Sequence, residues 1–229
     1  MRKTYWVYSL FCTDTFPGIR TRGIVIVLYQ PIAMYNFRMV PALFLDRDGV
    51  IIENRAGYVR RLEDITFIPR AVDALVKIQA IPFKIVIVTN QSAIGRGIIT
   101  TKIAEDINAK VQEHLLQLGG RVDAIYVCPH IPEDLCDCRK PHPGLILRAA
   151  NELSIDLSHS FMIGDALDDV RAGQNAGIPN TILLLTGRGK EQILLPRPQD
   201  MKPFMVCDDL LTAVEQHQDH LFHPSFHST

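Results

Sequence analysis

The chain has 229 residues, of which 47% are apolar, and a formal net charge of -1. A chain of this size and composition can bury a full hydrophobic core, so we expect one globular domain. The balanced charge excludes a general attraction to nucleic acid or to an anionic membrane, and any phosphate-binding site must therefore be local.

The first 38 residues follow no helical or strand period. They carry aromatic residues and two prolines, and Met39 stands directly before the run VPALFLDRDG. We therefore expect a poorly defined extension over 1–38 and a folded unit that begins near Met39. An extra edge strand over 23–29, GIVIVLY, is the alternative. The longest apolar run, at 23–34, is shorter than the roughly 20 residues that span a bilayer, so no transmembrane helix is expected.

Short apolar runs alternate with helical patterns from Ala42 onward. This alternation predicts an α/β fold, a doubly wound, Rossmann-like parallel sheet made of β-α-β units. The expected strands lie at 42–46, 84–89, 122–128, 160–165 and 180–186. The expected helices lie at 101–118 and near 70–80, 143–153, 167–176 and 209–217.

The segment 101–118 carries the clearest helical pattern, and a Gly-Gly pair follows to end it. Its apolar positions recur four apart on one face, at Ile103, Ile107, Val111 and Leu115. Pro143 suits the first turn of the following helix. We expect the domain to occupy 39–217 and residues 218–229 to form a mobile C-terminal tail.

Several expected strands end in a polar residue, namely Asp46, Thr89, Cys128 and Asp165. In an open α/β sheet the carboxyl ends of the strands face the ligand crevice. We therefore expect these side chains to converge on one site.

Asp46 and Asp48 flank one turn in FLDRDGV, where Gly49 lets the chain turn sharply. Phosphoryl transfer needs a nucleophile, a proton donor for the leaving oxygen and cations that offset the charge of the phosphate. Two carboxylates divide the first two tasks if one stays ionised and the other holds a proton. Mg²⁺ prefers oxygen ligands, and Asp165 in MIGDALDD supplies a third carboxylate. Taken alone, DRD reads equally well as a pair of solvated turn carboxylates.

The segment TNQS at 89–92 offers a hydroxyl group and two amides that could hold phosphate oxygens. By itself it also fits an ordinary turn that caps the next helix. Lys140 supplies the compact cation that a phosphate site needs.

Three cysteines and a histidine crowd into CPHIPEDLCDC, directly before Arg139 and Lys140. The four candidate ligands are Cys128, His130, Cys136 and Cys138. Three thiolates and one imidazole make a full tetrahedral set for Zn²⁺ and leave no position open for water, which indicates a structural zinc that shapes the loop. Free cysteines beside a surface histidine, or a catalytic zinc, are the alternatives. The zinc-bound loop would aim the two cations at the phosphate.

The motifs DRDG, TNQS, RKP and GDALDD, in this order on successive strand ends, resemble the haloacid dehalogenase superfamily of aspartate-nucleophile phosphatases. The match spans about 42–190. The resemblance implies that Asp46 is the nucleophile and Asp48 the general acid and base, and that Thr89 and Lys140 hold the phosphate.

The resemblance also implies a metal site and a supporting contact. Mg²⁺ would bind Asp46, Asp165 and the backbone carbonyl of Asp48, and Asp169 would orient Lys140. Because helices, strands and the zinc loop nearly fill the intervals between the motifs, no separate cap domain is expected. Recognition would then come from loops. The candidate substrate contacts are Arg55, Gly57, Tyr58, Thr89, Asn90, Gln91, Ser92, Arg139 and Lys140.

The zinc loop, together with GYV at 57–59 and NQSAIGRG at 90–97, is similar to the heptose-bisphosphate phosphatases. The histidinol-phosphatases share the zinc loop and stay open as an alternative, as does a non-catalytic, zinc-stabilised binding module. The resemblance implies a phosphorylated sugar as the substrate and Mg²⁺ and Zn²⁺ as cofactors. We expect no nucleic-acid or membrane partner, and the oligomeric state is left open, with a monomer compatible. Five cysteines, three of them crowded, favour a reducing cytoplasm.

Overall fold

The computed structural model describes residues 39–222. The expected extension over 1–38, the alternative strand at 23–29 and the end of the expected tail, 223–229, lie outside the described residues. Within the described part of the chain, no helix has the length and apolar character needed to cross a bilayer.

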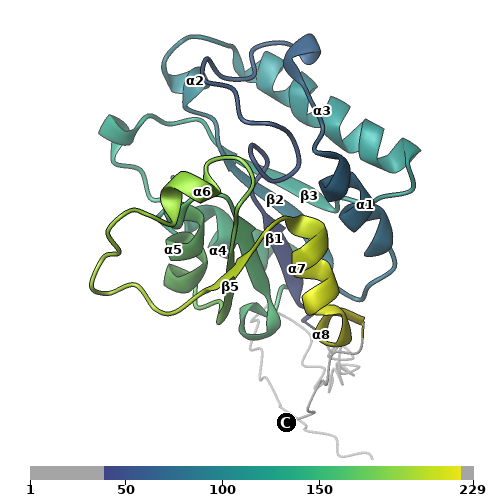
Figure 1. Cartoon of the computed structure of the whole chain (residues 1–229). Helices are drawn as coiled ribbons and strands as arrows, with labels where there is room; N and C mark the ends of the chain where they lie inside the picture. The colour runs from purple at the N-terminus through teal and green to yellow at the C-terminus, as the bar shows by residue number, and fades with distance from the viewer. Residues whose placement is uncertain (1–38, 223–229) are drawn as a thin grey trace, which may run out of the picture. The chain divides into compact units, whose positions relative to one another are not determined.

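A six-stranded parallel sheet forms the centre of the domain (Figure 1). Its strands are β1 (Ala42–Leu45), β2 (Lys84–Asn90), β3 (Ala124–Cys128), β4 (Phe161–Gly164), β5 (Asn180–Leu184) and β6 (Met205–Cys207). Their order is β3-β2-β1-β4-β5-β6, so the first strand of the described residues lies inside the sheet, between β2 and β4. The predicted doubly wound parallel sheet is confirmed.

Eight helices connect or follow the strands in the described residues: α1 (Pro69–Lys77), α2 (Ser92–Gly95), α3 (Thr101–Gln117), α4 (Gly144–Leu153), α5 (Leu167–Asn175), α6 (Gly189–Gln192), α7 (Leu210–Gln216) and α8 (Gln218–Phe222). Three short 3-10 turns lie at Leu62–Asp64, Pro132–Asp134 and Leu157–His159. The intervals between the strands hold only these elements and their loops, as expected for a fold without a separate cap domain.

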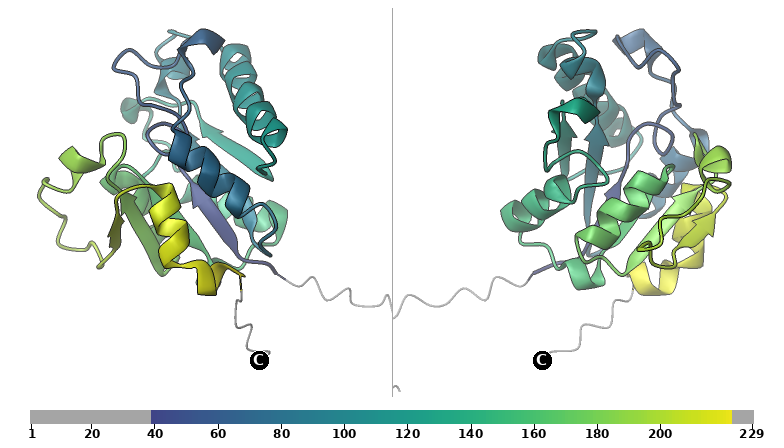
Figure 2. Two further views of the ribbon diagram at one scale, coloured as in Figure 1. Left: turned by 45° about the vertical axis from the view of Figure 1, so that its right-hand side comes forward. Right: turned by 90° about the vertical axis from the view of Figure 1, so that its left-hand side faces the viewer.

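The helices cover both faces of the sheet (Figure 2). Alternate residues of a strand point to opposite faces, so Leu43 and Leu45 pack with α1, α3 and α7 in one core cluster. Ala42 and Phe44 pack with α4 and α5 in the other cluster. Because both faces are buried, the strands read as nearly continuous apolar runs.

The structure differs from the expected elements in a few places. Three elements were not predicted from the sequence: β6, whose three residues are too few to form a pattern, and the single-turn helices α2 and α6. Ile103 was expected on the buried face of α3, but it is 36% exposed, and Ala104 takes the buried position in this first turn. Pro143 caps α4 rather than occupying its first turn. Residues 218–222, expected in a mobile tail, form α8 with Leu221 buried.

Candidate active site

The carboxyl ends of β1 and β4 bring three carboxylates together. Asp46 directly follows β1, Asp165 directly follows β4, and Asp169 lies in the first turn of α5. One oxygen of each side chain lies within 4.8 Å of the others, and all three residues are buried. Burying several like charges side by side is costly unless cations accompany them, so this cluster marks a binding site for positive charge.

Lys140 supplies one of these charges. Its Nζ lies 2.7 Å from Oδ1 of Asp46 and 2.6 Å from Oδ1 of Asp169, and it donates a hydrogen bond of 2.8 Å to the carbonyl oxygen of Val88. Burial alone would lower the pKa of Lys140, but the charges of Asp169 and Asp46 outweigh it and raise the pKa. Lys140 is therefore a fixed cation at the side of Asp46.

The backbone of Lys140 is held by Asn90 at the end of β2. The Asn90 Nδ2 donates to the Lys140 carbonyl oxygen at 3.1 Å, and the Lys140 N–H donates to Asn90 Oδ1 at 3.1 Å. This two-way contact fixes the loop at the point where the lysine enters the site. Asn90 was predicted as a substrate contact, and its amide group is occupied here by the loop.

Asp48 lies one turn beyond Asp46 and is held by two side chains. The Gln91 Nε2 donates to Asp48 Oδ2 at 2.8 Å and to Thr89 Oγ1 at 2.9 Å. The guanidinium group of Arg47 forms an ion pair with Asp48 at 2.9 Å. Burial raises the pKa of Asp48 above its ordinary value, although Arg47 opposes the shift. A carboxyl group that holds its proton more firmly is suited to donate it to a leaving oxygen.

Asp165 receives hydrogen bonds from two residues that the sequence analysis did not predict. The Asn54 Nδ2 donates to its Oδ2 at 2.5 Å, and the Arg188 backbone N–H donates to the same oxygen at 2.8 Å. Arg188 lies four positions beyond the end of β5, so it does not follow its strand directly as Asp165 does. Asn54 lies in an irregular loop and carries no such signal.

Gly49 approaches Asp165 closely and has a φ of 86°. A side chain at this position would collide with the Asp165 carboxylate and would be strained in the left-handed region. The sharp turn expected after Asp48 is thus the feature that lets the first loop and the β4 end share one site.

The cysteine and histidine cluster lies at the end of β3 and in the following loop. One ligand atom from each of Cys128, His130, Cys136 and Cys138 lies within 4.8 Å of the others. The Sγ and Nδ1 contacts among them run from 3.2 Å, between Cys138 and Cys128, to 3.7 Å, between Cys128 and Cys136. Two thiolates bound at about 2.3 Å to one tetrahedral ion lie about 3.7 Å apart, so the spacing fits Zn²⁺.

The predicted substrate contacts fall into two groups. Thr89, Gln91 and Lys140 belong to the site, while Arg55, Gly57 and Tyr58 line a separate cavity of about 480 Å³ with Arg60, Arg61 and Asp64. The Arg55 side chain donates to the carbonyl oxygen of Asp64 at 2.9 Å. In the described residues no hydrogen bond joins these three to the carboxylates, so their contact with substrate stays a prediction.

Two further candidates lie on short segments beside the site. Ser92 is the first residue of α2, and Arg139 directly precedes Lys140. The Arg139 Nη1 donates to the carbonyl oxygen of His130 at 3.1 Å, which ties it to the zinc-type loop. A role for either residue in substrate binding is also still a prediction.

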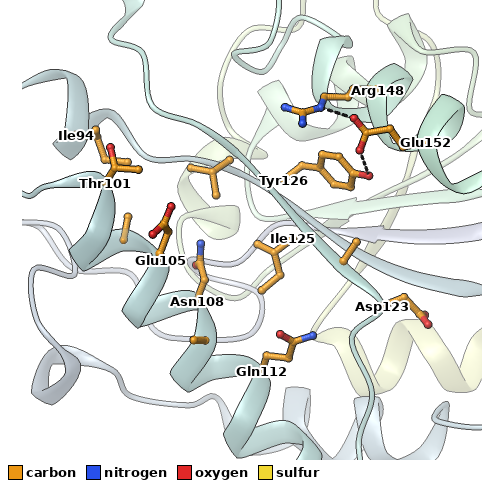
Figure 3. Close-up of a pocket in the computed structure, with 14 residues that line it drawn as sticks. Ile94, Thr101, Glu105, Asn108, Gln112, Asp123, Ile125, Tyr126, Arg148 and Glu152 are labelled. Carbon is orange, nitrogen blue, oxygen red and sulfur yellow. Dashed lines mark hydrogen bonds and ion pairs between the residues drawn. The ribbon is translucent and has the colours of Figure 1, made fainter.

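A larger cavity of about 650 Å³ lies at the outer edge of the sheet, between α3, β3 and α4 (Figure 3). The Tyr126 hydroxyl donates to Glu152 at 2.9 Å there, and burial together with Glu152 raises the pKa of Tyr126 to about 12. None of the predicted site residues lines this cavity. The reactive groups lie instead at the strand ends.

Known proteins resemble the chain in sequence. A family model described as HAD-hydrolase-like matches residues 137–213. The D-glycero-β-D-manno-heptose-1,7-bisphosphate 7-phosphatase of Helicobacter pylori strain J99 is 48% identical over 144 residues, which cover 62% of this chain and 82% of that protein. The protein of the same name from Escherichia coli K12 is 39% identical over 158 residues, covering 66% and 82%.

The fold resembles that of a solved structure over nearly the whole length of the solved chain. The D,D-heptose 1,7-bisphosphate phosphatase of B. bronchiseptica, in complex with magnesium and phosphate, matches with a TM-score of 0.73 and 33% identity. The match covers 79% of this chain and 99% of that one.

Proposed function

The chain belongs to the haloacid dehalogenase-like phosphatases, and from this premise we propose that it removes the 7-phosphate of D-glycero-D-manno-heptose 1,7-bisphosphate. The observation that carries the proposal is the buried cluster at the strand ends, where Lys140 pairs with both Asp46 and Asp169. The chain is 39–48% identical in sequence to relatives that are named for this activity, which supports the proposed substrate.

In the first step, Asp46 attacks phosphorus and forms an aspartyl-phosphate. The bond from phosphorus to the sugar oxygen breaks, and Asp48 donates its proton to that oxygen. Lys140 and Thr89 hold the phosphate oxygens, and Asp169 fixes Lys140. In the second step, Asp48 takes a proton from water, the water oxygen attacks phosphorus, and inorganic phosphate leaves Asp46 free again.

The donor set at the strand ends fits Mg²⁺. Asp46 and Asp165 offer carboxylate oxygens, and the backbone carbonyl of Asp48 adds a third ligand, as a hard cation prefers. Asp169, the third member of the cluster, is proposed to hold Lys140 instead; its Oδ1 lies 2.6 Å from the Lys140 Nζ, and its Oδ2 accepts the Ala166 N–H at 3.0 Å. When bound, Mg²⁺ offsets the negative charge of the phosphate beside the anionic nucleophile.

The second proposed metal is a structural Zn²⁺ at Cys128, His130, Cys136 and Cys138. Four protein ligands complete its tetrahedral shell and leave no place for a reacting water. Cysteines that are not paired in disulfides are kept reduced in the cytoplasm, which we propose as the location of the protein.

The substrate is tested by comparing kcat/KM for both anomers of heptose 1,7-bisphosphate with kcat/KM for histidinol phosphate. We expect the better heptose anomer to be favoured by about 10²-fold, which corresponds to about 2.7 kcal/mol of transition-state binding. NMR of the product should show loss of the 7-phosphate with the 1-phosphate retained. The Asp46→Asn variant, whose amide cannot attack phosphorus, provides the background rate. Faster turnover of histidinol phosphate would reject the heptose assignment.

A further inference from the structure

Arg47 stands between the two carboxylates of the DRD turn, and its charged side chain is almost completely buried, at 1% exposure. An arginine in the interior is costly unless its donors are paired. The roles proposed for Asp46 and Asp48 do not use it. Its contacts therefore indicate a function of its own.

The guanidinium group connects Asp48 to α3. Its Nε lies 3.1 Å from Asp48 Oδ2, and its Nη2 lies 2.9 Å from the same oxygen and 3.2 Å from Oδ1. Its Nη1 donates to Asn108 Oδ1 at 2.6 Å. Asn108 projects from α3 beside the cavity at the sheet edge (Figure 3), and only 7% of it is exposed. Arg47 thus reaches from a helix behind the site to a reacting carboxylate.

The two oxygens of Asp48 have unequal surroundings. Oδ2 is approached by Nε and Nη2 of Arg47 and by Nε2 of Gln91, whereas Oδ1 receives only one longer contact, at 3.2 Å. Donors from two different elements fix the carboxylate plane through Oδ2. Oδ1 is the oxygen left to face the reacting groups.

We propose that Arg47, braced by Asn108, is a positioning residue that holds Asp48 in the orientation needed for proton transfer. The proposal rests on the acid-base role proposed for Asp48. Catalytic groups have to be held within about 0.5 Å of the productive geometry, and fixing by packed neighbours is what achieves this. Loss of the Asn108 contact leaves Arg47 attached to Asp48 alone, so both can turn together.

The test uses Asn108→Ala in the full-length protein, with Gln112→Ala as the matched control. Gln112 lies one helical turn further along α3 and lines the same cavity, but its Nε2 donates to the Val122 carbonyl oxygen at 3.0 Å and not to Arg47. Both variants remove an amide side chain from α3 that lines the same cavity, although Asn108 is buried and Gln112 is exposed. They differ because only Asn108 is hydrogen-bonded to Arg47, which in turn contacts Asp48.

Each variant is measured with an alkyl phosphate and with p-nitrophenyl phosphate. The leaving oxygen of the alkyl phosphate has to be protonated, whereas nitrophenolate leaves with little help from an acid. The quantity compared is kcat/KM, because it reports the step in which the leaving group departs. We expect the kcat/KM of Asn108→Ala for the alkyl phosphate to fall about tenfold, which is less than the about 10²- to 10⁴-fold contribution of full acid-base catalysis. The loss for p-nitrophenyl phosphate should be several times smaller. Gln112→Ala should change kcat/KM only slightly, and by the same factor for both substrates. Arg47→Lys, which keeps the charge but not both contacts, should follow Asn108→Ala.

Equal losses on the two substrates, or no loss in a folded Asn108→Ala protein, would overturn the positioning role. Asp48→Asn shows which premise has failed: a selective loss with the alkyl phosphate keeps the acid role of Asp48, and an equal loss removes it together with the proposal. Heptose bisphosphate and histidinol phosphate are both alkyl phosphates. The test therefore gives an answer even if the heptose assignment is wrong.

Discussion

Lys140 shows how single residues make the site. A buried ammonium group lies between two buried carboxylates, and its backbone is held by Asn90. Removing one partner of such an arrangement leaves a charge without compensation, whereas removing an exposed charge costs little. The cation that is proposed to hold phosphate therefore depends on Asp169, which is not proposed to touch substrate.

At this scale we predict that Asp169→Asn lowers the free energy of unfolding by about 1–3 kcal/mol and lowers kcat/KM by about tenfold or more. The amide keeps the shape of the side chain but removes the charge that pairs with Lys140. Urea unfolding and steady-state kinetics measure the two effects. Asp168→Asn, one position earlier and exposed, is the control and should change neither. Wild-type behaviour of Asp169→Asn would show that Asp46 alone fixes Lys140.

At the scale of elements, the loop after β3 joins the two proposed metal sites. Cys128 ends the strand, Cys138 closes the ligand cluster, and Lys140 follows two positions later. The loop contains only one short 3-10 turn, Pro132–Asp134. Its conformation therefore depends on the ligand cluster rather than on backbone hydrogen bonds of regular structure.

We predict that Cys136→Ser loses zinc, unfolds at a lower temperature and has reduced activity even at saturating Mg²⁺, because a loosened loop displaces Lys140. Metal analysis of wild-type protein purified without chelators should give about one zinc per chain. Cys207→Ser, which removes a buried thiol outside the cluster, should keep its zinc. Brief EDTA treatment should stop wild-type catalysis until Mg²⁺ alone is added back. Wild-type protein without zinc would refute the structural zinc.

A second element prediction concerns the start of α7. Asp209 accepts the Thr212 N–H at 2.8 Å as the N-cap and pairs with Arg70 of α1. Burial acts in the opposite direction, but the bonds from Arg70 and Thr212 hold the pKa of Asp209 below its ordinary value. A lowered folded-state pKa means that the stabilisation is complete above the unfolded pKa of about 3.9 and is lost as the pH falls through the folded value.

Asp209→Ala should therefore lower the free energy of unfolding by about 1 kcal/mol at pH 7, and its difference from wild type should narrow below about pH 4. Asp209→Asn keeps a capping oxygen, so its free energy of unfolding at pH 7 should lie between those of Asp209→Ala and wild type. Urea unfolding at pH 7 and at pH 3 provides the comparison. If the free energies of unfolding of Asp209→Ala and wild type differ by the same amount at both pH values, the charge of Asp209 does not contribute as predicted.

The sequence allowed most elements to be predicted, and the misses have physical reasons. Four of the five longer strands are buried on both faces, the edge strand β3 is partly buried, and all five read as apolar runs, whereas β6 has only three residues. Asp46 and Asp165 follow such runs directly and could be found from the strand-end rule. Asn54 and Arg188 reach the site from loops, and the Arg47 contact to Asn108 joins residues that no local pattern relates.

For the whole molecule, the described residues contain a six-stranded sheet and helices on both of its faces. The first strand, β1, is paired on both sides by strands of this same region, and its residues Ala42 and Leu45 are fully buried. The two largest core clusters are formed by residues between Ala42 and Leu221. These features support a domain boundary near Met39, which stays a prediction.

We predict that a chain starting at Met39 folds and hydrolyses substrate with the kcat/KM of the full-length protein. Its melting temperature should lie within a few degrees, because about 1 kcal/mol shifts Tm by only about 2–4 °C in a domain of this size. Differential scanning calorimetry and phosphate release measure the two properties. An insoluble or clearly less stable product would place part of 1–38 in the core.

The position of β1 inside the sheet also sets the order in which the enzyme can become active during its synthesis. Leu43 pairs with Phe161, so the strand that precedes Asp46, the proposed nucleophile, is unpaired on this side until a segment that is synthesised much later has emerged. Until β4 emerges, one side of β1 is an open edge, and the Asp165 carboxylate that is proposed to bind metal does not yet exist. A nascent or prematurely terminated chain thus carries Asp46 and Lys140 without the completed site, and hydrolysis begins only once the second half of the sheet has joined the first.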